Sequence, residues 1–378
     1  MMQRWMLMFL AAWIALPVFA AGQVTVDQLE TTIAKAHRKS DAHIAKQISS
    51  LELTERLSTV RLARLNAELA GEESRLALIA LADRSAFLEL PPSEIPAMAA
   101  PDLVAQDVLL AKTAKYAKET LSKLPDFFAT QETIQFSGAN SKDSSLAAAD
   151  SSGQKLHLVS RYTATVRFLG GQEEIERGRP ETRSIRPGGK QLAVQGVFGP
   201  ILRVVLKDAL ANHPVWSHWE QGTGAPIAVF HYDVPEDKSH YAVAGSIDSG
   251  ILQPITAYRG EIGLDQSSGA ILRLTLIAVP HANSPIARGD LLVEYGPVEI
   301  GGRTYICPRR SVAISLARGS DLLHDVYKFP QAEQLPFQLE LNDVAYAQYH
   351  LFHTEMRLLP GETDGNPVSP LPSPAPKP

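Results

Sequence analysis

The sequence predicts an α+β fold, in which a small N-terminal helical bundle precedes a large curved antiparallel β-sheet (a half-barrel) with inserted helices. Apolar residues recur at helical spacing in residues 24–90, prolines interrupt residues 91–101, and strand-like runs separated by turn residues dominate residues 102–360. The 378 residues are enough for two or three domains with cores of their own.

Residues 1–20 have the features of a secretory signal peptide. Arg4 gives a positive start, an apolar run extends from Trp5 to Leu16, and the sequence Val-Phe-Ala follows at residues 18–20. We therefore expect cleavage near Ala20 and a periplasmic or secreted protein. The apolar run is short for a membrane span of about 20 residues, so we expect no stable transmembrane anchor after cleavage.

Composition narrows the range of partners and of covalent chemistry. The formal net charge is -5, and the sequence has no basic stripe with interleaved aromatic residues, so we expect no nucleic-acid partner. Cys307 is the only cysteine, which excludes an internal disulfide. Because Cys307 lies in a strand-like run without a local partner, we expect its thiol to be buried and inert.

Residues 24–90 are expected to form three or four short helices. Thr25 and Gln28 have the spacing of a capping box, in which a hydroxyl and a side-chain amide satisfy backbone donors at the start of a helix. Gly71 is expected to end a later helix. Helices this short are marginal by themselves and must pack together. The resulting bundle offers a surface for a protein partner.

The segments that follow differ in composition. Residues 91–101 are expected to be a proline-rich linker, and an amphipathic helix should follow from Asp102 to Leu124, where Pro125 ends it. A second inserted helix is expected between Gly199 and Pro214. Residues 137–153 favour a loop, and the proline-rich tail at residues 361–378 favours disorder.

Strands are predicted from alternation of side-chain character. Between Leu156 and Phe168 the even-numbered positions are apolar or small and the odd-numbered positions are mostly polar, as in an antiparallel sheet with one packed face. Residues 258–279 predict a hairpin around the sequence "DQSSG", and residues 291–308 predict another around Gly301 and Gly302.

No catalytic residue, metal site or cofactor is predicted. Four histidines lie close together in the sequence, but their spacing matches no helical zinc pair, and we expect surface or turn histidines: His213, His218, His231 and His240. The sequences "SGQK" at residues 152–155 and "SIDSG" at residues 246–250 match short motifs of serine and aspartic enzymes without their companion motifs. We therefore expect a non-catalytic protein.

Aromatic residues gather around the second inserted helix and the strands that follow it. The candidate ligand-binding residues are Phe198, Trp216, Trp219, Phe230 and Tyr232. They suit the wall of a concave sheet that receives an acyl chain, where each buried methylene contributes about 0.8 kcal/mol. Aromatic residues at this density are also typical of an ordinary core, and the sequence alone does not separate the two interpretations.

Two hairpin sequences carry a family resemblance. "GEIGLDQSSGAILRLTL" at residues 260–276 ends a strand in Asp, turns through a Ser/Gly pair and returns as "ILRL", and "VEIGGRTYICPRRSV" at residues 298–312 is similar to the next such hairpin. Together with the order of helices and strands, residues 102–359 resemble the periplasmic lipoprotein-carrier superfamily, the LolA-like fold shared with RseB-type sensor domains. The resemblance implies a curved sheet that binds lipid or lipidated peptide in its hollow.

The function that we expect is non-catalytic binding of a hydrophobic or lipidated ligand in the concave β-sheet of a cell-envelope protein. The N-terminal bundle departs from the usual carrier pattern, which favours a scaffold or sensor over a simple shuttle. Two alternatives stay open: a structural or protein-interaction scaffold with a filled core, and an extracytoplasmic hydrolase with a site assembled from distant residues. A cavity lined by Trp216 and Phe230 would favour ligand binding, and a solid core would favour the scaffold.

Overall fold

The computed structural model describes residues 22–36, 38–119, 123–138, 156–178, 197–198, 200–222, 224–241, 255–281, 284, 286–318 and 337–352. The predicted signal peptide, most of the predicted loop at residues 137–153, both short enzyme-like motifs and the proline-rich tail lie outside these residues.

The described N-terminal part consists of four helices and one pair of two-residue strands. Their bounds are β1 Gln23–Val24, α1 Val26–Ala36, α2 Asp41–Ile48, β2 Glu52–Leu53, α3 Thr59–Glu68 and α4 Glu72–Arg84. The strands β1 and β2 pair in parallel, which the sequence did not predict. Buried residues of all four helices form one apolar cluster that includes Leu29, Ile48, Leu65 and Leu78.

Side-chain caps fix where these helices begin. At the start of α1, Thr25 N donates to Gln28 Oε1 (2.9 Å) and Gln28 N donates to Thr25 Oγ1 (3.3 Å), so the predicted capping box is confirmed. Helix α4 is capped by a residue of α2, because Asp41 accepts hydrogen bonds from Glu73 N and Ser74 N. A Cβ atom at Gly71 would lie 1.9 Å from the Asp41 carboxyl carbon, so any larger residue there would displace the capping carboxylate.

The linker at residues 91–101 holds a single 3-10 turn, η1 Pro92–Glu94, and leads into helix α5 Leu103–Glu119. The linker lies against the sheet, because Trp219 Nε1 donates to Ala99 O (2.9 Å). The second inserted helix is present as α7 Pro200–Ala211, and a second 3-10 turn, η3, spans Glu236–Lys238.

Ten strands form one antiparallel sheet in the order β5-β4-β3-β12-β11-β10-β9-β8-β7-β6. Their bounds are β3 Phe127–Gly138, β4 Leu156–Leu169, β5 Gln172–Arg177, β6 Val215–Glu220, β7 Ile227–Val234, β8 Ala257–Asp265, β9 Ile271–Val279, β10 Ile286–Ile300, β11 Arg303–Arg318 and β12 Phe337–Leu351. The sheet is not closed, because β5 and β6 each pair on one side only among the described residues. The mixed α and β composition and the large antiparallel sheet are confirmed.

The last strand among the described residues pairs with the first strand of this sheet. Strand β12 runs antiparallel to β3, with Leu341 opposite Phe136 and Leu351 opposite Phe127. Both predicted hairpins are confirmed as β8–β9 and β10–β11. In the first hairpin, Asp265 Oδ1 accepts hydrogen bonds from Ser267 Oγ and Ser268 N, which holds the turn.

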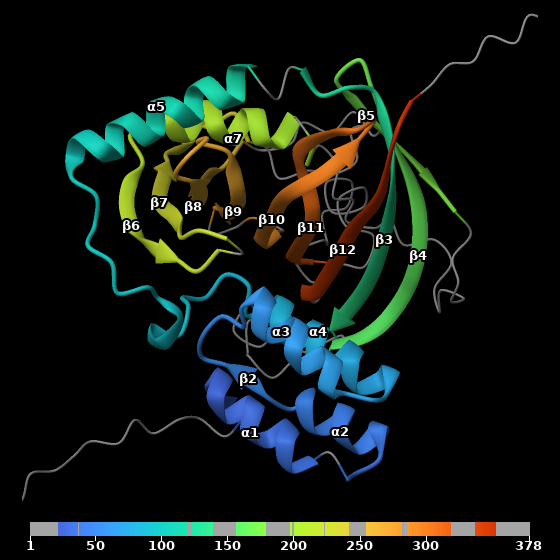
Figure 1. Cartoon of the computed structure of the whole chain (residues 1–378). Coiled ribbons are helices and arrows are strands. Elements are labelled where there is room, and N and C mark those ends of the chain that lie inside the picture. The colour runs from blue at the N-terminus through green and yellow to red at the C-terminus, as the bar shows by residue number, and fades with distance from the viewer. Residues whose placement is uncertain are drawn as a thin grey trace, which may run out of the picture.

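The central strands are buried on both faces. On β10, Leu291 and Val293 belong to a core cluster with α7, whereas Leu292 between them belongs to a cluster with α4. Because successive side chains of a strand point to opposite faces, we name these the α7 face and the α4 face. In Figure 1, α5 and α7 lie together over strands β6–β9. Helices α3 and α4 lie beside the lower ends of β12 and β3.

One detail of the strand prediction was wrong. Ala164, Val166 and Phe168 lie in the α7-face cluster as expected, but Leu156 and Leu158 pack in the α4-face cluster. The register between β3 and β4 shifts between Gln135 and Phe136, which marks a β-bulge. A bulge adds one residue to a strand and reverses the faces of all residues beyond it.

Cys307 is fully buried in β11, and burial raises the pKa of its thiol to about 12, so the expectation of an inert thiol is confirmed. Among the described helices, none is both long and apolar enough to cross a membrane.

The turn between β10 and β11 predicts the effect of two glycine substitutions. Gly302 has a φ of +76°, and a Cβ atom there would meet nothing within 4 Å, so Gly302→Ala should destabilise the protein only through its left-handed backbone, by about 1–2 kcal/mol. Gly224→Ala is the matched control, because a Cβ atom there also meets open space and its backbone lies outside the left-handed region. Urea unfolding of both variants measures the difference, and equal stabilities would contradict this account of the turn.

Candidate functional site

A row of charged side chains crosses the α4 face of the sheet. From β6 to β4 its members are His218, Glu220, Glu261, Arg273, Glu294, Arg310, Asp343, Glu132 and Arg161. Strand register places Arg273 directly opposite Glu294, and Glu294 directly opposite Arg310. Acidic and basic side chains therefore alternate from strand to strand over this part of the row, which stabilises neighbouring strands against each other.

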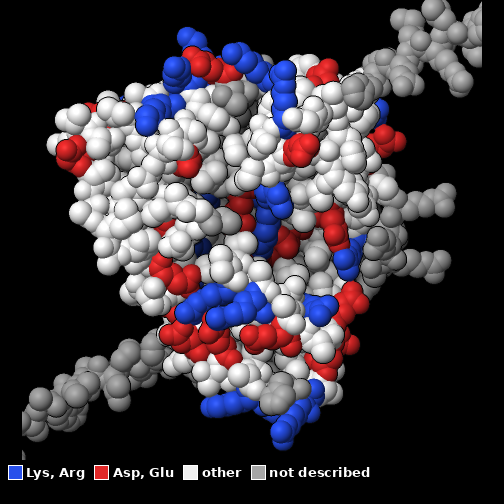
Figure 2. Space-filling model, in the orientation of Figure 1, with Lys and Arg blue, Asp and Glu red and all other residues white. Residues whose placement is uncertain are grey.

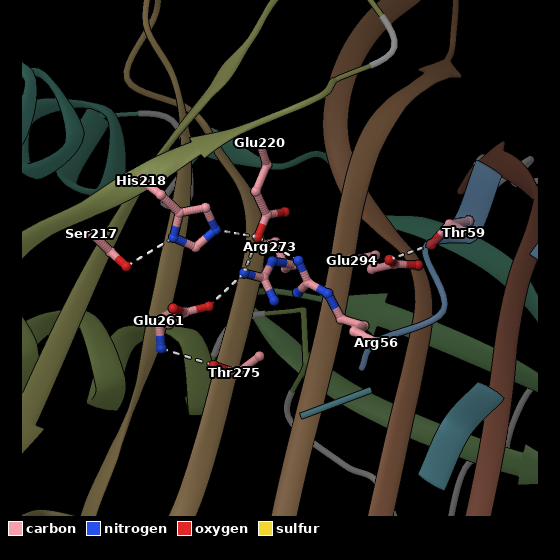
Figure 3. Close-up of polar contacts among 9 residues, drawn as sticks. All are labelled: Arg56, Thr59, Ser217, His218, Glu220, Glu261, Arg273, Thr275 and Glu294. Atoms are coloured by element: carbon pink, nitrogen blue, oxygen red, sulfur yellow. Dashed lines mark hydrogen bonds and ion pairs between the residues drawn. The ribbon is translucent and has the colours of Figure 1, made fainter. Parts of the chain in front are cut away.

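Glu220 is the centre of the most buried part of this row. Its Oε1 atom accepts hydrogen bonds from Arg56 Nη2 (2.5 Å) and Arg273 Nη2 (2.7 Å), and His218 Nε2 lies 3.1 Å away. Arg273 Nη2 also contacts Glu261 Oε2 (2.7 Å). Figure 3 shows the side chains of Arg56 and Arg273 converging on Glu220, with Arg56 arriving from outside the sheet.

These contacts keep Glu220 ionised in spite of its burial. Burial by itself raises the pKa of Glu220, but the charge of Arg273, the hydrogen bond from His218 and the charge of Arg56 together lower that pKa well below its usual range. Burial and the charge of Arg273 lower the pKa of Arg56, while Glu220 opposes both effects. The cluster is thus a compensated buried ion network.

Backbone contacts place Arg56 over the sheet. Arg56 N donates to Glu89 O (2.7 Å), and Leu57 N donates to Ser85 Oγ (3.1 Å), so the segment before α3 is tied to the segment after α4. At the start of α3, Thr59 Oγ1 donates to Glu294 Oε1 (2.7 Å). The N-terminal end of α3 thereby faces a carboxylate of the charged row, which suits the positive end of the helix dipole.

A second contact joins α4 to the row. Arg310 forms ion pairs with Asp83 of α4 and with Asp343 of β12, the latter at 2.9 Å. Burial raises the pKa of Asp83, the charge of Asp343 adds to this, and Arg310 opposes it. Arg161 of β4 lies 3.4 Å from Glu72 at the start of α4.

Figure 2 shows a hollow between the α1–α4 part of the molecule and the sheet, where acidic and basic side chains gather. Four residues of the N-terminal segment contact the charged row: Arg56, Thr59, Glu72 and Asp83. The arrangement therefore orients the four N-terminal helices on the α4 face, since each charged group meets a partner of opposite sign in only one alignment.

A cavity of about 480 Å³ lies beside this charged row, between α4 and the α4 face. Polar and apolar atoms share its wall about equally, and the apolar lining residues are Leu53, Leu81, Phe87, Leu88, Ile277, Ala278, Ala287, Ile314, Leu316, Leu339 and Leu341. Four charged residues also line it: Glu52, Arg84, Arg288 and Asp290. Its volume falls within the range of about 300–1,000 Å³ that is typical of small-molecule sites.

The aromatic residues singled out from the sequence lie on the other face. Phe198, Trp219, Phe230 and Tyr232 are at most 6% exposed and belong to the core cluster with α7, while the partly buried Trp216 packs against it. Trp216 packs edge-to-face against Trp219 (ring centroids 4.8 Å apart) and Phe230 (5.6 Å). None of the five lines the cavity under α4, and their role as a ligand wall stays a prediction.

Three of the four clustered histidines pair with carboxylates. His218 contacts Glu220, His231 contacts Asp233 at 3.0 Å, and His240 Nδ1 contacts the buried Asp208 at 2.6 Å. Asp208 also accepts hydrogen bonds from His240 N and Tyr258 OH, so it ties the segment after η3 to α7 and β8. Within the described residues, no group of three His, Cys, Asp or Glu side chains could hold a metal ion.

Sequence reasoning missed both the charged row and the cavity. Arg273 interrupts the apolar run "AILRLTLIAV", and Arg310 and Glu294 likewise stand in strand-like runs. A charged residue in an otherwise apolar strand indicates a buried partner, but Asp83 is 227 residues from Arg310, and Arg56 is 164 residues from Glu220. Only the docking of the N-terminal helices brings them together.

Comparisons with protein-family models, curated proteins and solved structures found no match to this chain. The resemblance to the lipoprotein-carrier superfamily therefore stays a prediction.

The ion network predicts a pH-dependent effect of Glu220→Gln. The substitution leaves Arg56 buried without a carboxylate and leaves Arg273 with Glu261 alone, so it should destabilise the protein by about 3–5 kcal/mol at neutral pH. Because the folded-state pKa of Glu220 is lowered from 4.5, its contribution is present above pH 4.5 and is lost as the pH falls below that value. The stability difference between the variant and the native protein should therefore shrink on acidification.

Denaturant unfolding between pH 3 and pH 8 (approximate limits, set by the carboxylate range) measures this difference. Glu299→Gln removes an exposed carboxylate of β10 and serves as the control, with an expected effect within about 0.5 kcal/mol. A constant difference across the pH range would show that Glu220 acts through packing and not through its charge.

Proposed function

We propose that this protein is an exported, non-catalytic cell-envelope protein that binds a lipid or a lipidated peptide, with the apolar chain of the ligand in the cavity between α4 and the sheet. The observation that carries the proposal is the wall of this cavity. Leu316, Leu339 and Leu341 of the sheet face α4 across a space of about 480 Å³, with charged groups also in the lining. Apolar side chains beside charged ones suit an amphiphilic ligand, whose chain and head group need different surroundings.

Burial of an apolar chain supplies the driving force. Each methylene transferred from water into such a wall contributes about 0.8 kcal/mol, so a chain of ten methylenes gains roughly 8 kcal/mol before the loss of its own freedom is subtracted. No catalytic step is part of this proposal.

The finer features of the predicted fold belong to the same proposal. We interpret the sheet as a half-barrel of the LolA-like or RseB-type kind, with α7 on its inner face, and we interpret α1–α4 as a helical bundle that docks on its outer face. The pairing of β12 with β3 and the helix inserted before β6 support the first interpretation. The shared apolar cluster of α1–α4 supports the second.

The location follows from the N-terminal sequence. The positive start, the apolar run from Trp5 to Leu16 and the pattern before Ala20 support export and cleavage. The intact mass of the mature chain, isolated from the periplasm or the medium, tests this part: a chain that still carries residues 1–20 would contradict it.

A second candidate function is a protein-interaction scaffold. The observation that favours it is the filled α7 face, where Phe198, Phe230 and Tyr232 are at most 1% exposed. In that case the cavity under α4 would stay empty in the cell. Native mass spectrometry of the protein isolated from its own compartment, followed by organic extraction, distinguishes the two functions, because only the first predicts a co-purifying acyl chain.

Filling the cavity predicts a loss of ligand binding. Ala287 lines the cavity, so Ala287→Phe should place a ring in the space that the chain occupies and weaken binding of a fluorescent fatty-acid probe by tenfold or more, equal to about 1.4 kcal/mol. Displacement of the probe by an unlabelled chain gives the affinity.

The control for this experiment is Ala347→Phe, which adds the same ring at an exposed position of β12 outside the cavity. Thermal unfolding of both variants shows that they are folded. Undiminished binding by a folded Ala287→Phe variant would place the ligand elsewhere.

A further inference from the structure

Three of the four charged side chains of the cavity come from α4 and β10. Arg84 is the last residue of α4, and Arg288 and Asp290 lie near the start of β10. Arg288 and Asp290 are two residues apart on one strand, so both point to the α4 face. The apolar residues of β11 and β12 continue the wall from there. A ligand with its chain against those residues would present its head group to the charged part.

Arg288 has hydrogen-bond donors that the described residues do not use. Its Nε atom donates to Asp290 Oδ2 (2.5 Å), and its guanidinium carbon lies 5.7 Å from the ring centroid of Phe87. Within the described part of the chain, no hydrogen bond or ion pair involves its two terminal amino groups. The planar guanidinium is fixed by the ion pair and the ring, and its free N–H groups match the oxygens of a phosphate or carboxylate.

One carboxylate oxygen of Asp290 accepts no hydrogen bond from the described residues. The residue is 5% exposed, its Oδ2 atom accepts from Arg288, and its buried Oδ1 atom has no hydrogen-bond partner. Leaving a buried polar atom without a partner costs about 1–3 kcal/mol, and more for a charged group. Asp290 lines the cavity, so a rotation of its carboxylate would turn this oxygen toward an N–H or O–H donor of a ligand.

Arg84 adds a second positive charge to the same wall. Burial lowers the pKa of Arg84 and the charge of Arg288 lowers it further, while Glu52 opposes them. An anionic group between the two guanidinium groups would relieve their repulsion. The cavity therefore offers two guanidinium groups and the carboxylates of Asp290 and Glu52, and Asp290 holds the oxygen without a hydrogen-bond partner.

We infer that the ligand of this cavity is an amphiphile with a zwitterionic head, in which an anionic phosphate or carboxylate binds Arg288 and Arg84 and an ammonium group with N–H donors binds Asp290 Oδ1. This inference rests on the proposed function and names the ligand class of the same site. A phosphoethanolamine head has this chemistry. A phosphocholine head does not, because its trimethylated nitrogen carries the same charge but no N–H donor.

The test compares single-chain lipids that share one acyl chain and differ in the head. Lysophosphatidylethanolamine, lysophosphatidylcholine, lysophosphatidic acid and the uncharged monoacylglycerol are titrated into the full-length mature protein below their micelle concentrations, with calorimetric detection. The ethanolamine head should bind about tenfold more tightly than the choline head, because only it satisfies a buried charged acceptor. The monoacylglycerol should bind most weakly.

Two variants assign the preference to residues. Asp290→Ala should reduce the ethanolamine-over-choline ratio to about one, since it removes the acceptor oxygen that only an N–H donor satisfies. Arg288→Gln should weaken all three phosphate lipids and leave the monoacylglycerol unchanged. Arg303→Gln, at an exposed position of β11, is the control and should change none of the affinities.

The outcomes separate this inference from the proposed function. Equal affinity for all four lipids would overturn the head-group assignment and leave lipid binding intact. Binding of none would overturn both. Free O-phosphoethanolamine that binds as tightly as its lysolipid would uphold the head-group assignment and overturn the apolar chain as part of the ligand. The lipid series uses the native protein, so these outcomes hold even if a variant fails to fold.

Discussion

Helix α4 is apolar on two sides, and the position of the whole N-terminal part depends on this. Leu78, Leu81 and Ala82 of α4 pack in the cluster shared with α1–α3, while Ala80 belongs to the cluster on the sheet. A helix that is apolar on more than one side must be buried between two layers. Through α4 the four N-terminal helices therefore share a boundary with β10, β11 and β12.

The charged row gives this boundary its alignment. Apolar contacts between a helix and a sheet are tolerant of sliding and rotation, whereas buried ion pairs are costly in every arrangement that separates the partners. Arg56 with Glu220, and Asp83 with Arg310, connect the two layers at points on different strands. The apolar contacts thus supply most of the attraction, and the ion pairs select one orientation.

The two faces of the sheet offer a ligand very different surroundings. On the α7 face, aromatic rings such as Phe230 and Tyr232 fill the space beneath the helix. On the α4 face, the end of α4 and the segment after it leave about 480 Å³ over the leucines and isoleucines of β11 and β12. The face with the denser aromatic sequence is therefore the filled one, and the aliphatic face holds the space.

The sequence by itself determined most of the local structure. The capping box at Thr25, the hairpins at residues 258–279 and 291–308, helix α7 and the buried thiol of Cys307 follow from spacings of a few residues, and short-range sterics and hydrogen bonding decide such features. The strand faces of β4 were predictable only up to its bulge, because an inserted residue is invisible to a count of alternating positions.

Tertiary structure alone decided which face would be filled, where a cavity would remain, and which partner each buried charge would have. Arg273 is a single charged residue in an apolar run, and its buried charge is compensated by Glu220, 53 residues earlier in the chain. Arg56 and Glu220 are 164 residues apart. Such pairings depend on the docking of whole elements, which is set by the summed burial of many side chains and not by any local pattern.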